Sequence, residues 1–348
     1  MSISHAINAA QSGLKVSGLR ADIVATNVAN ASTPGYVRRS VLLGETLVGG
    51  RTSGVTATGV TRSADAALTA ERRTLSSDVA QASLMSSTWQ VLSSRLGDDA
   101  EGTGLFSKFS KFEAALSASV TSPESGTQLA ALLDSANAVV AELNSLSKLV
   151  SQQRSEADRE IADGVNVVNK ALKQIEELNG LLVGVDGSTS QAAALMDERQ
   201  RTLDVIAEYL PIEVVPRAGG AIDVITVEGV YLVAGKAKQL EFSPANSFGA
   251  DMTLDSGTLS GLTIDGQNLT PGASSYAAVS SGMFGALFTL RDTDLPAFGA
   301  QLDTVANDLV TRLSNDSIDP TKTPGDFGLF VDTGTPGDPG LAGRIDIN

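Results

Sequence analysis

The stretch "IADGVNVVNKALKQIEELNGLL", residues 161–182, decides what kind of fold this chain can adopt. Its apolar residues recur at the heptad spacing that places side chains on one face of a helix. They are Ile161, Val165, Val168, Leu172, Ile175 and Leu182. Most charged residues of the same tract lie off that face and indicate a solvated outer surface. The spacing therefore predicts a long amphipathic helix with a coiled-coil type of seam.

This tract begins well before residue 161. The sequence "TSPES" has the features of a helix start, with Ser122 as the N-cap, Pro123 in the first turn and Glu124 near the positive end of the helix dipole. A further helix is expected over "QAAALMDERQRTLDVIAEYL", and an earlier one from Ala64 to Leu96, where apolar residues recur every seven positions. The chain is therefore helix-rich up to about residue 210.

The character of the sequence changes at Pro211. "PIEVVP" and "GAIDVITVEGVYLVAG" alternate or run β-branched residues between glycine-containing turns, which predicts antiparallel hairpins. Helical periodicity returns in "SGMFGALFTLRDTDLPAFGAQLDTVANDLVTRLSND", where Pro296 marks a kink or a new helix start. The closing "AGRIDIN" favours a strand.

These changes predict an elongated, multi-domain α+β protein, in which a long helical bundle or coiled-coil domain carries an inserted antiparallel β domain. The expected parts follow the shifts in pattern. They are an N-terminal helix, turn and extended connector (1–62), the first part of the long-helix domain (63–210), the β-rich insert (211–280), the helical return (281–316) and a Gly/Pro/Asp-rich segment (317–348). Residues 37–62 are expected to form short extended segments and turns.

Composition excludes several classes of function. The 348 residues carry a net charge of −15 without a stripe of Lys or Arg, which argues against a nucleic-acid surface. No run of about 18 apolar residues exists, so we expect no membrane span, and the N-terminus lacks the pattern of a cleavable signal. The chain has no Cys, which excludes disulfides and suits a protein exported unfolded.

A search for catalytic chemistry finds little. His5 is the only histidine, which excludes His-based triads and multi-histidine metal sites. No nucleophile elbow, phosphate-binding loop or dinucleotide fingerprint is present. Paired carboxylates such as Asp197 and Glu198 are common in an acidic chain and are more often solvated surface than general acid and base. We predict no catalytic, cofactor-binding or metal-binding residue.

The first helix, expected over residues 3–28, has a narrow seam of small and apolar residues at heptad spacing. Gly13 and Gly18 each weaken the helix by roughly 1 kcal/mol relative to Ala. Because helix nucleation is costly and this seam buries little, the helix should be marginal alone and should need a partner. The simpler alternative is an ordinary first helix packed on its own domain.

The sequence "ATNVANASTPGY", residues 25–36, ends this helix. Pro34 and Gly35 occupy the second and third positions of a type II turn, where glycine supplies the required positive φ. Asn27 and Asn30 can bond to nearby backbone groups at the helix end. Local chemistry alone therefore predicts a well-formed helix stop.

The order and position of these residues resemble the N-terminal signature of the bacterial flagellar axial proteins, which comprise the rod, hook and hook-associated proteins. In that family the pattern Asn-x-x-Asn-x-x-Thr-Pro-Gly-aromatic follows the first helix, and here it is matched by Asn27, Asn30, Thr33, Pro34, Gly35 and Tyr36. The segments "YVRRS", "LMDERQRTLDVIAEYLPIEVV" and "SSGMFGALFTLRDTDLPAFGAQLDTVANDLVTRL" are similar to the hook-associated members in particular. The resemblance covers roughly residues 1–40, 195–235 and 280–316.

The resemblance implies a structural subunit, secreted through the flagellar type III export apparatus, that forms a ring at the junction between hook and filament. Its implied partners are the hook protein, the next hook-associated protein, further copies of itself and an export chaperone. The implied assembly interface comprises a helix seam and the turn that orients it: Ile3, Ile7, Leu14, Val24 and Val28, with Asn27, Asn30, Pro34, Gly35 and Tyr36.

One departure from the family and two alternatives accompany this interpretation. Family members end in a helix that pairs with the N-terminal one, whereas this chain ends at "GRIDIN", so we expect a chain truncated before that helix. The first alternative is another axial protein, either hook or rod. The second is an extracellular adhesin or enzyme in which the β segment is the working domain.

Overall fold

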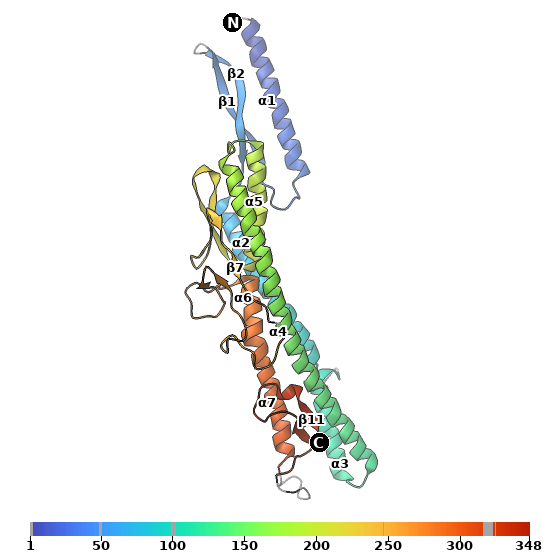
Figure 1. Cartoon of the computed structure of the whole chain (residues 1–348). Coiled ribbons are helices and arrows are strands. Elements are labelled where there is room, and N and C mark those ends of the chain that lie inside the picture. The colour runs from blue at the N-terminus through green and yellow to red at the C-terminus, as the bar shows by residue number, and fades with distance from the viewer. Residues whose placement is uncertain are drawn as a thin grey trace.

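The computed structural model describes residues 3–48, 51–98, 100, 102–245, 247–315, 323 and 325–348, and it shows an elongated shaft of helices with small antiparallel sheets (Figure 1). The helices are α1 (Ile3–Ala29), α2 (Ala66–Leu96), α3 (Gly104–Thr121), α4 (Gly126–Val183), α5 (Ser190–Tyr209), α6 (Gly282–Thr289) and α7 (Leu295–Leu313). The predicted α+β class and elongated shape are confirmed.

Helix α4 is the backbone of the shaft. Its 58 residues extend for about 87 Å at 1.5 Å per residue. All six seam residues of the stretch 161–182 are buried, as their spacing predicts. One hydrophobic cluster packs on the second half of α4 and includes α5, α6 and β strands. A second cluster packs on its first half and includes the end of α2, α3, α7 and the C-terminal strands.

The start of α4 differs from the sequence prediction. Ser122 follows the last residue of α3, and the N-cap of α4 is Ser125, whose side chain accepts a hydrogen bond from the Gln128 amide. Ser122, Pro123 and Glu124 form the connection between the two helices. Ser122 and Ser125 are both residues that favour an N-cap, so the sequence alone did not distinguish them. In the structure, Ser125 is the serine that lies three residues before the Gln128 amide that it caps.

The β strands between α5 and α6 form two small antiparallel sheets. The first has the order β3-β4-β5-β6 and the second the order β7-β8-β9. Their bounds are β3 (Ile212–Pro216), β4 (Ile222–Thr226), β5 (Tyr231–Ala234), β6 (Lys236–Ala237), β7 (Leu240–Glu241), β8 (Thr263–Ile264) and β9 (Gln267–Asn268), with a 3₁₀ turn η1 (Ala218–Gly220). Alternate residues of β4 are buried against α4 and α5, which is the period-2 pattern predicted from "IDVIT".

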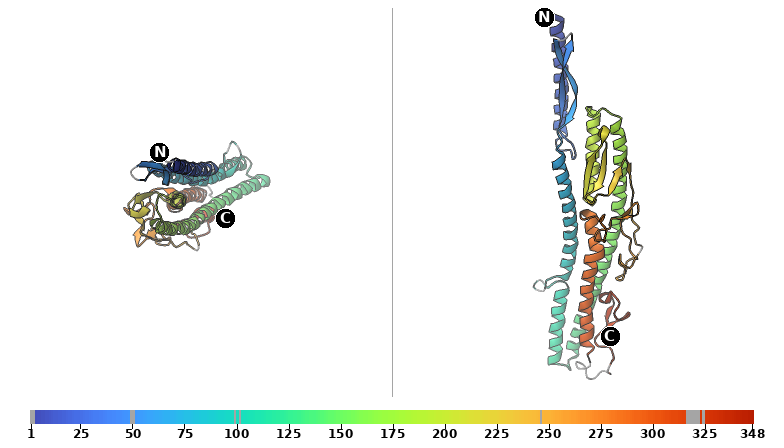
Figure 2. Two further views of the ribbon diagram at one scale, coloured as in Figure 1. Left: turned by 90° about the horizontal axis from the view of Figure 1, so that it is seen from above. Right: turned by 90° about the vertical axis from the view of Figure 1, so that its left-hand side faces the viewer.

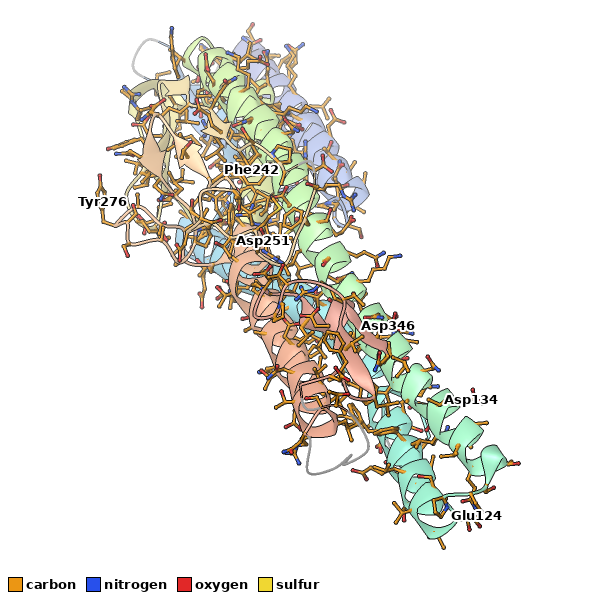
Figure 3. The ribbon with its side chains drawn as sticks, turned by 60° about the horizontal axis from the view of Figure 1, so that its bottom comes forward. Glu124, Asp134, Phe242, Asp251, Tyr276 and Asp346 are labelled. Carbon is orange, nitrogen blue, oxygen red and sulfur yellow. The ribbon has the colours of Figure 1, made fainter. Side chains whose placement is uncertain are left out.

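A π-helical turn, η2 (Leu290–Asp294), joins α6 to α7 and carries a buried arginine. The Nη1 atom of Arg291 lies 2.6 Å from Oδ1 of Asp158 on α4. Phe242, labelled in Figure 3, packs with its ring centre 5.6 Å from the same guanidinium. Pro296 lies in the first turn of α7. The predicted kink or new helix start is therefore observed as a π turn followed by a new α-helix.

The C-terminal part of the chain forms a small sheet against α4 and α7. It comprises β10 (Phe330–Asp332), a 3₁₀ turn η3 (Leu341–Gly343) and β11 (Ile345–Ile347), which pairs with β10. The strand predicted from "AGRIDIN" is confirmed as β11. Within the expected Gly/Pro/Asp-rich segment, residues 317–322 and 324 lie outside the described residues.

The N-terminal part, residues 3–48 and 51–62, is called the arm below. It consists of α1 and one long hairpin of β1 (Arg39–Val48) and β2 (Arg51–Arg62), in place of the short extended segments that were expected. The two strands pair along their whole described length, with register shifts at Leu42/Leu43 and Thr46/Leu47. In Figure 2 the arm extends the line of α2 beyond the end of the shaft, and it contributes no described residue to either hydrophobic cluster.

Candidate assembly interface

Helix α1 has two faces with different surroundings. Val16 and Ile23 are buried against the hairpin, and they are the two buried residues of this helix. The heptad residues on the other face are strongly exposed: Ile3 by 79%, Ile7 by 60%, Leu14 by 75%, Val24 by 59% and Val28 by 72%. The predicted seam is thus a continuous apolar stripe that no described residue of this chain covers.

The inner face of α1 packs on the hairpin, so the hairpin is one partner of this helix. From the sequence, we had expected the partner to be a different segment. Val16, Ile23 and Asn27 follow one another at intervals of seven and four, which places them together on the hairpin side. The hairpin approaches closely at Gly54, where a Cβ atom would lie 2.3 Å from the Ser12 Oγ. That Oγ accepts a hydrogen bond of 3.1 Å from the Val55 amide. The spacing of Val16, Ile23 and Asn27 can be read from the sequence. The hairpin was not predicted as their partner, because its glycine-rich strands were expected to be short extended segments.

Asn27 connects the end of α1 to the start of the hairpin. Its Oδ1 accepts hydrogen bonds from the Arg39 amide (2.9 Å) and the Tyr36 hydroxyl (2.8 Å), and its Nδ2 donates to the Arg39 carbonyl oxygen (2.8 Å). The Arg39 guanidinium lies over the Tyr36 ring. Asn27 and Tyr36 are therefore brought together, and they fix the angle between helix and hairpin.

The other motif residues form the turn itself. Asn30 bonds to Thr26 and Thr33, which closes the helix end locally. The Tyr36 amide donates to the Thr33 carbonyl oxygen at 3.1 Å, and Gly35 has a φ of +74°, as the turn prediction requires. A Cβ atom at Gly35 would lie 2.4 Å from Cγ of Arg201 on α5. The glycine is thus needed for both its conformation and its contact with the shaft.

A buried ion cluster fastens the arm to the shaft. Asp197 on α5 is 2% exposed, and its two oxygens each lie 2.6 Å from a guanidinium nitrogen, one of Arg39 and one of Arg62. The Val60 amide also donates to the Ser188 carbonyl oxygen at 2.6 Å. From the sequence alone Asp197 was interpreted as solvated surface, because its two partners lie more than 130 residues away. Because of this separation, no residue near Asp197 in the sequence indicates the ion cluster.

Arg199, two residues further along α5, ties the same region to α4 and η1. Its Nη1 donates to Asn179 Oδ1 at 3.0 Å and to the Gly220 carbonyl oxygen at 2.7 Å. Burial, with a smaller contribution from the nearby charge of Arg62, lowers the pKa of Arg199 to about 10. The guanidinium therefore stays charged at neutral pH, and it serves as a structural donor at the upper end of the shaft.

A groove runs between α1 and β1 beside this joint. Its volume is about 790 Å³, and the residues that line it include Arg20, Val24, Val28, Arg38 and Val41. Val24 and Val28 belong to the exposed stripe, so the groove and the stripe form one surface. A lining that combines apolar side chains with arginines suits a macromolecular partner.

Clusters of possible metal ligands were sought among the described residues. These residues contain no group of three or more His, Asp or Glu side chains that could hold an ion. His5 lies on the exposed side of α1. Among the described residues no helix is long and apolar enough to cross a bilayer.

Comparisons with known proteins identify first a class and then a family. Residues 7–36, which hold most of α1 and the turn, match the family described as "Flagella basal body rod protein". The first helix and its turn are thus similar to those of a flagellar protein. Residues 91–317, well over half of the chain, match the family described as "Flagellar hook-associated protein FlgK helical domain". The chain belongs to this FlgK family, which confirms the resemblance seen in its sequence.

Individual relatives agree with the family. The flagellar hook-associated proteins 1 of Salmonella typhimurium and of Salmonella typhi are each 25% identical over 253 residues, covering 70% of this chain and 45% of the relative. The chain therefore spans about half the length of the curated relatives it matches. The structure of the flagellar hook junction protein FlgK from Burkholderia pseudomallei has a similar fold, with a TM-score of 0.59 and 18% identity. That match covers 76% of this chain and 46% of the other.

Proposed function

We propose that this protein is a structural subunit of the bacterial flagellum that assembles at the junction between hook and filament. The observation that carries the proposal is the exposed heptad stripe on α1, in a chain of the FlgK family. Burying apolar surface stabilises by about 25 cal/mol per Å², so a solvated stripe of this length favours association. The family supports a structural role, and the proposal gives no residue a catalytic one.

The assembly interface is the stripe together with the turn that orients it. Ile3, Ile7, Leu14, Val24 and Val28 make the contacts. The motif residues Asn27, Asn30, Pro34, Gly35 and Tyr36 hold α1 at a fixed angle to the hairpin. Their hydrogen bonds and the Gly35 contact with Arg201 support this role, because they link the helix end to both β1 and α5.

The partners follow from the position of the related proteins in the flagellum. We infer that the subunit contacts the hook protein, the next hook-associated protein and neighbouring copies of itself in a ring. We further infer that it is secreted unfolded through the type III export apparatus with an export chaperone. The absence of Cys supports passage in an unfolded state, because no disulfide can mispair on the way.

The organisation into parts is also a proposal. The helical segments 63–210 and 281–316 form one domain, and the β-rich residues 211–280 form an insert on its side. In support, α4 contacts both α5 and α7, which come before and after the sheets in the sequence. The expected N-terminal part, 1–62, is then a separate part whose described residues form the arm, and the described residues of the segment 317–348 pack on the domain through the second hydrophobic cluster.

The test uses isolated hooks that end at the hook protein. Added subunit should bind at the hook end, and electron microscopy with a gold-labelled chain measures the occupied fraction. Leu14→Glu places a charge in the middle of the stripe and should abolish binding, while circular dichroism shows an intact fold. Tyr276→Glu is the matched control, since Tyr276 projects into solvent from the β-rich side (Figure 3) and is 82% exposed.

Two results would contradict the proposal. One is the absence of end binding by the unmodified chain at concentrations well above those of the hooks. The other is equal binding by the Leu14→Glu and Tyr276→Glu variants, because the stripe would then take no part. Binding along the sides of the hook would point to the adhesin alternative.

A further inference from the structure

The two edges of the hairpin formed by β1 and β2 have different surroundings. On the β2 edge, the Val60 amide donates to the Ser188 carbonyl oxygen at 2.6 Å. Further along the same edge, the Val55 amide donates to the Ser12 hydroxyl at 3.1 Å. The β2 edge is therefore held against the shaft at one point and against α1 at another.

Hydrogen bonds at the start of β1 show which of its backbone groups point away from β2. The Arg39 amide and carbonyl bond to the side chain of Asn27, whereas the Arg38 carbonyl oxygen accepts a bond from the Ser63 amide. Backbone groups of successive residues in a strand point to opposite sides, so every second residue after Arg39 also points away from β2. We call these residues the open edge: Val41, Leu43, Glu45 and Leu47.

The open edge has no partner within the described part of the chain. No described residue forms a hydrogen bond with its outward amides and carbonyls. Both register shifts of the hairpin place their extra residues, Ser53 and Thr58, in β2, so the alternation of β1 is not interrupted. Exposed edges are commonly protected by Pro, Lys or a bulge, and β1 contains no Pro and no Lys. This edge can therefore accept another strand.

The groove between α1 and β1 lies along the start of the open edge. Its lining on the β1 side comprises Arg38, Arg39, Ser40 and Val41. Because side chains of neighbouring residues in a strand lie on opposite faces, four successive lining residues belong to the edge of the strand rather than to one face. The opposite wall is α1, where Val24 and Val28 supply apolar surface. An extended chain in this groove has the edge of β1 on one side and α1 on the other.

We propose that the open edge binds an extended peptide segment of a partner protein, which adds to the hairpin as a third strand. The first part of this segment lies in the groove, and the rest follows β1 towards the tip of the hairpin. An extended segment fits because it presents amides and carbonyls with the same spacing as the open edge. From Val41 to Leu47 the pairing length is seven residues, or about 23 Å at 3.3 Å per residue.

The groove also determines which side chains the segment carries. Alternate residues of an added strand face the α1 side, where Val24 and Val28 favour apolar side chains. Arg20 and Arg38 line the groove, are exposed, and form no ion pair with a described residue. Each guanidinium can bind a carboxylate through paired hydrogen bonds. The partner segment is therefore one in which apolar and acidic residues alternate.

A synthetic peptide of four Val-Glu repeats tests strand addition on the full chain. Methylating the backbone nitrogens of all its valines, or of all its glutamates, removes the amides on one side of the extended peptide, because alternate amides point to opposite sides. Isothermal titration calorimetry measures the three dissociation constants. The unmodified peptide and one methylated isomer should bind, and the other isomer should bind more than about tenfold more weakly. Hydrogen exchange should slow at the open edge and stay unchanged on the β2 edge.

Variants connect binding to the backbone of β1. Glu45→Pro removes one outward amide, and because this amide is not part of the pairing with β2, the hairpin should remain intact by circular dichroism. It should weaken the unmodified peptide about tenfold. Glu45→Gln is the matched control, since it removes the same charge and keeps the amide. This control should bind the peptide at least as tightly as the unmodified chain does.

A second pair of measurements concerns the charges of the groove. Arg20→Glu/Arg38→Glu should weaken the Val-Glu peptide about tenfold and should permit binding of a peptide of four Val-Lys repeats. Arg312→Glu reverses an exposed charge on α7 and should change neither affinity.

Four results would overturn the inference. They are equal affinity of the two methylated isomers, unchanged affinity of Glu45→Pro, unchanged selectivity of the double arginine variant, and a helical circular dichroism signal from the bound peptide. Slower exchange at the open edge with rising protein concentration, without peptide binding, would make a second copy of this chain the occupant.

Strand addition and the proposed junction role can fail separately. Leu14 belongs to the exposed stripe and does not line the groove, so Leu14→Glu should bind the peptide as the unmodified chain does. Hook binding without peptide binding removes strand addition alone. Peptide binding by a chain that does not bind hooks removes the junction role and leaves strand addition in place.

Discussion

Helices α1 and α4 share one sequence pattern and have opposite surroundings. Both carry apolar residues at heptad spacing, yet 19 of the 58 residues of α4 are buried and only 2 of the 27 residues of α1 are. The seam of α4 meets α5, the sheets and α6 within the chain, and the outer seam of α1 meets solvent. Periodicity therefore identifies which face of a helix packs, and the rest of the chain decides whether anything covers it.

The two regions are also held in different ways. The shaft is held by two hydrophobic clusters, whereas the described residues of the arm are joined to it by an ion cluster, close contacts of Gly35 and Gly59, and a backbone hydrogen bond. Arm and shaft should consequently respond to different substitutions. The four predictions below test that separation.

The largest effect is expected from Leu172→Ala in the core of the shaft. Leu172 is fully buried, so removing three carbon atoms should lower the free energy of unfolding by about 2–5 kcal/mol. Urea titration followed by circular dichroism measures this loss. The matched change in the arm, Ile23→Ala, should leave the main transition in place. A comparable shift of that transition in both variants would show that arm and shaft unfold together.

Asp197→Asn tests the joint. Removing the charge leaves Arg39 and Arg62 facing a neutral amide, which should weaken the attachment of the arm by roughly 2–3 kcal/mol. The loss is not larger because the two arginine side chains keep 13% and 15% of their exposure to solvent. Hydrogen exchange should speed up in β1, β2 and the end of α1, with no change in α4. Uniform acceleration across the chain would instead assign Asp197 to the folding of the shaft.

Gly35→Ala tests the turn. The positive φ costs a non-glycine residue about 1–2 kcal/mol, and the added Cβ also displaces Arg201. We expect faster proteolysis between α1 and the hairpin while the thermal transition of the shaft is retained. Gly229→Ala, at a positive φ with open space around it, isolates the backbone contribution. Equal sensitivity of the two variants to protease near residue 35 would remove the special role of this turn.

The smallest effect is expected from Gly13→Ala and Gly18→Ala, and it is stabilising. A Cβ atom at either position meets nothing within 4 Å, so each change should stabilise α1 by roughly 0.5–1 kcal/mol through its helix propensity. Slower amide exchange confined to α1 is the expected readout. An unchanged exchange rate would mean that the hairpin, rather than helix propensity, limits the opening of α1.

Local signals in the sequence predicted most of the fold. The heptads of α4, the hairpin pattern of β4, the turn at Pro34 and Gly35 and the strand at the C-terminus were all visible, because each depends on residues close together in the chain. Asp197 was missed because its function depends on Arg39 and Arg62, which only the folded chain brings near it. The hairpin partner of Val16 and Ile23 was missed for the same reason.

The continuity of α4 has a mechanical consequence. One uninterrupted helix of about 87 Å runs through both hydrophobic clusters, so a bending load applied at either end is carried by the whole shaft rather than by one part of it. No described helix continues from the shaft into the arm, which is attached through the Asp197 ion cluster, close glycine contacts and a backbone hydrogen bond. Under a bending load we therefore expect the contact between arm and shaft to deform before α4 does.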